Sequence, residues 1–169
     1  GSDTIEYFFP SPMLDVLFMG VENYEHFTPG PQGVYKNTDG GVTWERTLEG
    51  NVWDMAFSSS FAHDGIAFAS LREYKIALGI WKTEDWGKTW FPVNDGLLLG
   101  MDLTGYRIAV ARHFSQDQTV FTISGLGLYK STNGGESWSM LLSPEDVQHL
   151  PHFVVLSPNY TYDQTLLIW

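Results

Sequence analysis

Three short stretches of this sequence combine an aspartate or asparagine with glycine, a hydroxyl residue and tryptophan. Such side chains could bind calcium or supply a catalytic acid. The stretches are 37–44, 83–90 and 131–138, and their tryptophans lie 46 and 48 residues apart. A catalytic acid is needed once or twice in a protein, whereas a regular repeat indicates one structural role per unit. We therefore expect structural turns, with neither catalytic nor metal-ligating residues.

Each stretch, called a box below, is predicted to lock a tight turn between two strands. The aspartate or asparagine can accept hydrogen bonds from backbone N–H groups of its own turn, and the hydroxyl residue can add another. Glycine supplies a backbone conformation that is costly for other residues, and tryptophan can bury a large apolar area between repeats. The predicted structural residues are Asp39, Gly41, Thr43, Trp44, Asp85, Gly87, Thr89, Trp90, Asn133, Gly135, Ser137 and Trp138.

The segments between the boxes predict four short antiparallel strands, A to D, in each repeat. Runs rich in β-forming residues are separated by Gly, Pro, Asn and Asp turns, and the A–B turns contain Asp15, Asp64, Asp117 and Asp163. This pattern indicates an all-β fold, a β-propeller of four-stranded blades, of which about three and a half are present in one partial propeller spanning 1–169. The predicted blades are 5–48, 51–93 and 106–142, with a half blade at 152–169; the one expected helix is Ser143–Val147, with a capping pattern.

Composition excludes some partners. The 9 Lys and Arg residues against 20 Asp and Glu residues give a net charge of −11, which disfavours nucleic acid and anionic membrane surfaces. The absence of cysteine excludes disulfides and thiolate metal sites. Neither metal-ligand spacing of histidines nor a nucleotide-binding motif occurs, so no cofactor is expected.

The boxes follow the pattern S-x-D-x-G-x-T-W, and the sequence resembles the Asp-box (BNR-repeat) propeller superfamily. That superfamily includes sialidases, xyloglucan-degrading glycoside hydrolases, sortilin-type receptors and photosystem assembly factors, so the resemblance implies a propeller fold and favours an extracytoplasmic or secreted location. Sialidases of this superfamily use an arginine triad. This chain has only four arginines and lacks the F/Y-R-I-P-like stretch, which argues against sialidase activity.

A ligand site is predicted on the face opposite the boxes. Alternating strand directions place the A–B turns and the boxes on one face, and the B–C and D–A connections on the other. The B–C loops differ in length between blades, and irregular loops on a regular scaffold often carry binding sites. The predicted ligand-binding residues are Tyr24, His26, Arg72, Tyr74, Asp95 and Glu145; further candidates are Glu25, Phe27, Glu73, Lys75, Asp102, Asp146, His149 and His152.

Two functions remain open on the sequence. The first is a non-catalytic module that binds a protein or a glycan, indicated by the regular boxes, the variable loops and the lack of a complete catalytic set. The second is a fragment of a propeller glycoside hydrolase that acts on a polysaccharide or glycan. Pairing of the open last blade with another copy of the chain is a further expectation, because a half blade leaves an unpaired strand edge.

Overall fold

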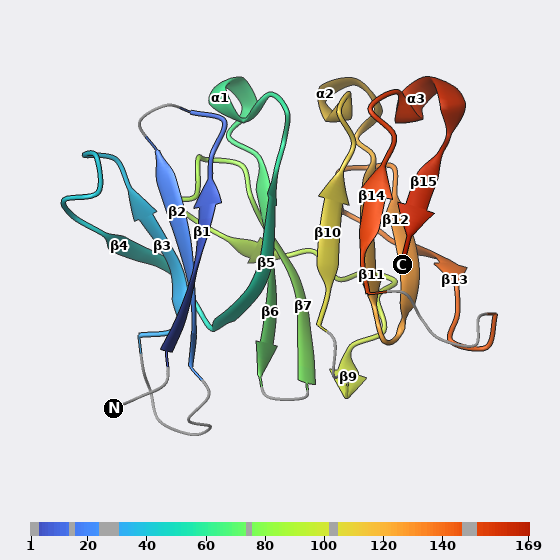
Figure 1. Cartoon of the computed structure of the whole chain (residues 1–169), viewed down its shortest axis with the longest axis horizontal. Coiled ribbons are helices and arrows are strands. Elements are labelled where there is room, and N and C mark those ends of the chain that lie inside the picture. The colour runs from blue at the N-terminus through green and yellow to red at the C-terminus, as the bar shows by residue number, and fades with distance from the viewer. Residues whose placement is uncertain (1–3, 14–15, 24–30, 74–75, 102–104, 147–151) are drawn as a thin grey trace.

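The computed structural model describes residues 4–13, 16–23, 31–73, 76–101, 105–146 and 152–169, and it is an all-β structure. Its strands form four separate antiparallel sheets that stand side by side (Figure 1). Three sheets have the predicted four strands in sequence order, and the last has two. The structure therefore confirms the partial β-propeller.

The first two blades contain nine strands. In the second blade, β9 pairs with β7 as a fifth strand. The strands of the first blade are β1 (Thr4–Pro10), β2 (Leu17–Asn23), β3 (Gly33–Asn37) and β4 (Glu45–Glu49). Those of the second are β5 (Asn51–Phe57), β6 (Ala67–Glu73), β7 (Ile76–Thr83), β8 (Phe91–Pro92) and β9 (Gly100–Met101).

The third blade and the half blade contain the remaining six strands. They are β10 (Arg107–Val110), β11 (Val120–Ser124), β12 (Gly127–Ser131), β13 (Ser139–Leu142), β14 (Val154–Leu156) and β15 (Leu166–Ile168). The inner strands β5, β10 and β14 are neighbours, so the blades contact one another along these strands (Figure 1).

The A–B turns contain short helices that sequence analysis predicted only as polar turns. These are α1 (Phe61–Asp64), α2 (Phe114–Asp117) and α3 (Tyr160–Asp163). Each begins with an aromatic residue that is buried and ends with an aspartate whose carboxylate accepts the N–H two residues further on, at 2.9 Å. The aromatic anchor and the aspartate together close a single helical turn.

The helix expected at Ser143–Val147 is not formed over its described part, where 144–146 make a turn. The predicted capping contact is nevertheless present, because the Asp146 carboxylate accepts both the Ser143 N–H at 2.6 Å and the Ser143 hydroxyl at 2.8 Å. Val147 lies outside the described residues. The capping hydrogen bonds therefore form where residues 144–146 make a turn.

The boxes have the predicted hydrogen bonds. Asp39 accepts the Thr43 N–H at 2.9 Å and the Thr43 hydroxyl at 2.6 Å, and these bonds lower the pKa of Asp39 to about 2. Asp85 makes the same two bonds with Thr89; although burial opposes the shift, the hydrogen bonds lower its pKa to about 2. In the third box the amide of Asn133 instead donates to the Ser137 hydroxyl at 2.9 Å. The turn therefore forms with either side chain.

Two box glycines offer a matched test of the turn. Gly41 and Gly87 both have positive φ, at 92° and 76°, but a Cβ on Gly41 would meet no atom within 4 Å, whereas one on Gly87 would lie 2.6 Å from the Phe18 ring. We expect Gly41→Ala to lower the free energy of unfolding by about 1–2 kcal/mol through backbone strain alone. Gly87→Ala should cost about 1 kcal/mol more through the clash. Urea denaturation followed by circular dichroism would measure both, and equal losses would contradict this account.

The tryptophans of the second and third boxes, Trp90 and Trp138, contact the preceding blade. The Trp90 indole donates to the Thr47 hydroxyl of the preceding blade at 3.2 Å, and the Trp138 indole donates to the Val93 carbonyl at 2.8 Å. Trp138 is only 5% exposed and belongs to the core between the second and third blades. Each of these two boxes therefore connects its own blade to the preceding one.

Candidate functional site

The ends of β2, β6 and β11 that lead into the B–C connections lie on the face opposite the boxes, as the strand order requires. On this face a hollow of about 160 Å³ is lined by Gln32, Gly50, Asn51, Arg72, Glu73 and Leu78. Gln32 and Asn51 supply amides, Arg72 a guanidinium and Glu73 a carboxylate. Two of the candidate residues, Arg72 and Glu73, thus meet in one concave site.

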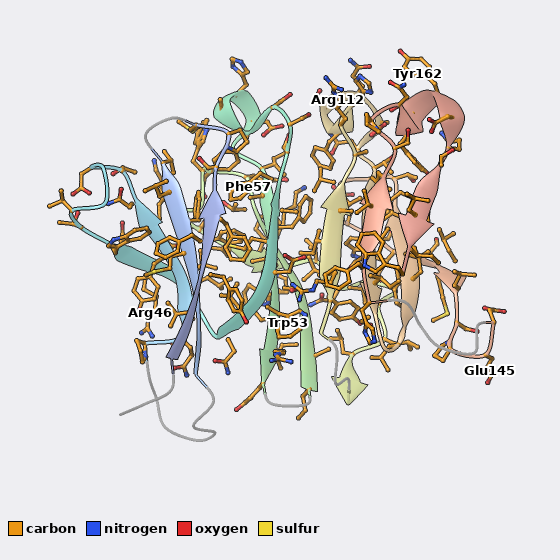
Figure 2. The ribbon with its side chains drawn as sticks, in the orientation of Figure 1. Arg46, Trp53, Phe57, Arg112, Glu145 and Tyr162 are labelled. Carbon is orange, nitrogen blue, oxygen red and sulfur yellow. The ribbon has the colours of Figure 1, made fainter. Side chains whose placement is uncertain are left out.

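Arg72 is buried, and its guanidinium carbon lies over an aromatic ring. Its guanidinium carbon is 3.5 Å from the centre of the Trp53 ring, and the guanidinium carbon of Arg107 lies 4.6 Å from the same centre. Trp53 therefore contacts two cations, an arrangement that cation–π attraction stabilises. Figure 2 shows Trp53 on the half of the molecule that faces away from α1 and α2.

A β-bulge places Trp53 in this position. Val52 pairs with Leu71 and Asp54 pairs with Ser70, which leaves Trp53 as an extra residue of β5. Strict alternation would point neighbouring residues to opposite sides of the sheet, whereas a bulge redirects a side chain. As a result both Trp53 and Asp54 contact the start of the third blade.

Asp54 is the carboxylate with the most altered acidity at this contact. One of its oxygens accepts the Ile108 N–H at 2.9 Å, and the other lies 3.9 Å from the Arg107 guanidinium. Burial raises the pKa of Asp54 to about 6, because these neighbours do not fully compensate the loss of water. Asp54 is therefore able to exchange a proton near neutral pH.

Sequence analysis missed Trp53, Asp54 and Arg107. For Asp54 and Arg107 the sequence contained a signal, because the two residues occupy the same position in their inner strands. Each lies four residues before the residue that follows its strand, which is Ser58 for β5 and Ala111 for β10. The corresponding residue for β14, four before Ser157, is Phe153. These equivalent positions contact one another in turn, with the Arg107 guanidinium carbon 5.2 Å from the Phe153 ring centre. The charged residues Asp54 and Arg107, at the same position of two largely apolar strands, would have indicated that these positions contact one another.

The remaining predicted ligand-binding residues are not gathered at this site. Asp95 does not line this hollow; its carbonyl accepts the N–H of Trp138, the last residue of the third box, at 2.8 Å. Glu145 is exposed in a turn far from Trp53 (Figure 2). The positions outside the described residues are Tyr24, Glu25, His26, Phe27, Tyr74, Lys75, Asp102 and His149.

Over 4–13, 16–23, 31–73, 76–101, 105–146 and 152–169, no group of three or more His, Asp or Glu side chains could hold a metal ion. In that same part of the chain, no helix has the length and apolar character needed to span a bilayer.

Comparison with known proteins identifies the class of fold. No protein-family model and no curated protein matches the sequence. Among solved structures, an ancestral GH74 enzyme is similar, with a TM-score of 0.66 and 20% sequence identity over 86% of this chain. The match covers 19% of that enzyme, so this chain spans about a fifth of its length. The chain therefore has the fold of part of a β-propeller of the kind found in a glycoside hydrolase.

Proposed function

We propose that this chain is part of an Asp-box propeller that binds carbohydrate, without catalysis of its own, on the face opposite the boxes. The position of Arg72 carries the proposal, because this side chain both stacks on Trp53 and lines the hollow beside Asn51. Amide, guanidinium and carboxylate groups provide the donors and acceptors that sugar hydroxyls require, and sites of this kind combine a few such groups with apolar surface.

Glycan binding can be tested with substitutions of two polar side chains that line the hollow. A glycan array probed with the full chain should identify oligosaccharide ligands, and Asn51→Ala and Glu73→Gln should each weaken binding about fivefold, the effect of losing one hydrogen bond. Arg112→Gln is the control, since Arg112 is exposed near α2 on the box face. Isothermal titration calorimetry would measure the affinities. An array without any ligand, or affinities unchanged in both variants, would contradict the proposal.

A glycoside hydrolase subdomain is the second candidate function. It is favoured by the similar fold of the GH74 enzyme and by Asp54, whose pKa of about 6 would suit a general acid. Hydrolysis usually needs a second carboxylate. Glu73 lies three residues beyond the Asp54 partner Ser70 on β6, so the backbones of Asp54 and Glu73 are roughly 10 Å apart. Polysaccharide turnover that disappears in both Asp54→Asn and Glu73→Gln would favour this function over binding alone.

A further inference from the structure

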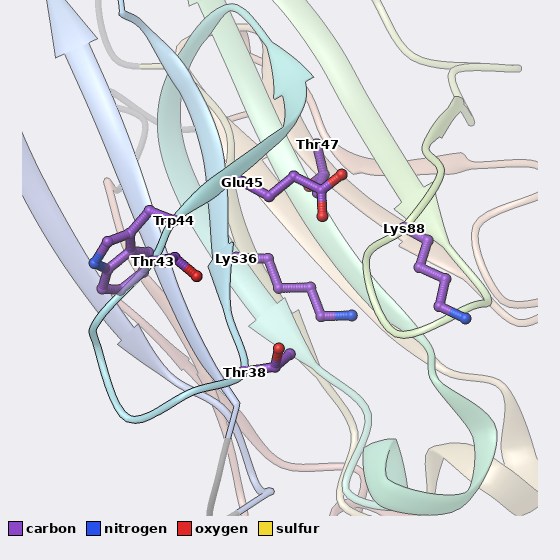
Figure 3. A pocket seen from close by; sticks show the side chains of 7 residues that line it. All are labelled: Lys36, Thr38, Thr43, Trp44, Glu45, Thr47 and Lys88. Carbon is purple, nitrogen blue, oxygen red and sulfur yellow. The ribbon is translucent and has the colours of Figure 1, made fainter.

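A second hollow, of about 520 Å³, lies between the first two blades on the side of the boxes. It is lined by Lys36, Thr38, Thr43, Trp44, Glu45, Thr47 and Lys88. Figure 3 shows Lys36 reaching into it from β3 and Lys88 from the second box, while the Trp44 indole lies away from both ammonium groups. The hollow is thus bordered by cations from two different blades.

The two lysines have no close carboxylate partner in the described part of the chain. No ion pair within 4 Å involves either of them there, and Glu45 is the one acidic residue of the lining. Burial and the neighbouring charge of Lys88 lower the pKa of Lys36, although Asp85 and Glu45 act in the opposite direction. The positive charge of Lys36 is therefore incompletely balanced, in a protein whose net charge is −11.

The contact between the second and third blades has different residues at four of the seven positions that line this hollow. There the lysine equivalent to Lys36 is Lys82, which is buried and forms an ion pair of 2.7 Å with Glu84. The residues that correspond to Thr38, Glu45, Thr47 and Lys88 are Glu84, Phe91, Val93 and Glu136. A purely structural contact between blades can therefore be built without a second lysine and without threonines at the positions of Thr38 and Thr47, so the repeat does not require Lys88.

We propose that the hollow between Lys36 and Lys88 binds the carboxylate or sulfate group of an acidic saccharide. Two ammonium groups would pair with the oxyanion, and the hydroxyls of Thr38 and Thr47 would meet sugar hydroxyls. The hollow is far larger than a single oxyanion, which favours a ligand that carries the charge on a larger body. This inference shares only the ligand class with the proposed function. Because the two hollows have no residue in common, variants of each test one proposal alone.

The experiment is titration calorimetry of the full chain at low ionic strength. The probes are an oligogalacturonate, a sulfated oligosaccharide, a neutral oligosaccharide of equal length and inorganic sulfate. We expect one or both acidic oligosaccharides to bind, Lys36→Gln and Lys88→Gln each to weaken binding roughly five- to tenfold, and added salt to weaken it further. Which acidic probe binds more tightly identifies the charged group as carboxylate or sulfate.

Two further variants make the result specific. Glu45→Gln removes the one carboxylate of the lining and should strengthen binding, whereas Arg112→Gln removes an exposed cation elsewhere on the box face and should leave it unchanged. The proposal is overturned if no acidic probe binds, if the neutral oligosaccharide binds equally well, if inorganic sulfate alone binds, or if Arg112→Gln weakens binding as much as the lysine variants. Thermal unfolding of each variant would verify that the fold is retained.

Discussion

Replacement of Trp138 with alanine is expected to lower the free energy of unfolding by about 3–5 kcal/mol, the range for removing a buried tryptophan. The side chain is 5% exposed within the core between the second and third blades, and its indole N–H donates to the Val93 carbonyl. Truncation would leave both a cavity and an unpaired carbonyl. Urea denaturation of the variant and of the parent protein, followed by circular dichroism, would measure the loss.

Trp44 is the matched control, because it occupies the same position of the first box. It is half-buried and meets Phe8 of its own blade edge to face, with ring centres 6.3 Å apart. Trp44→Ala should therefore cost clearly less than Trp138→Ala. Similar losses in the two variants would mean that the tryptophan stabilises its own turn and not the contact between blades.

The second large effect is a pH dependence of stability that arises from Asp54. Its pKa is about 6 in the folded protein and 3.8 in the reference state, so between these values only the folded state retains the proton. The free energy of unfolding should then fall as pH rises from about 4 to 6 and above, by about 3 kcal/mol in total, because each pH unit of pKa difference corresponds to about 1.4 kcal/mol. Urea denaturation at a series of pH values would measure this decline.

Asp54→Asn should remove this decline, because asparagine resembles the protonated acid and can still accept the Ile108 N–H. Asp39 and Asp85 act in the opposite direction: with pKa values of about 2, their stabilising contribution is lost only as pH falls below about 4. They therefore do not interfere in the window from pH 4 to 6. An unchanged slope in Asp54→Asn would show that another group causes the pH dependence.

The fold could be predicted because its determinants are local and repeated. The hydrogen bonds of Asp39 with Thr43 and of Asp85 with Thr89 span four residues, so the spacing of side-chain types specifies the turn directly. The A–B turns were predicted in position but not as helical turns. Their aromatic anchors Phe61, Phe114 and Tyr160 act by burial in the core, which a local pattern does not describe.

The candidate sites depended on contacts between strands of one blade and between blades. Arg72 and Trp53 come together through a bulge in β5, and Asp54 meets Arg107 although 53 residues separate them in the chain. In the same way Lys36 and Lys88 border one hollow only because the second box folds against the first blade. The sequence by itself determined the repeat, the turns and the blade order, since these depend on neighbouring residues. Only the tertiary structure decided which charged groups meet, because the acidity and pairing of a charge depend on burial and on residues brought from other blades.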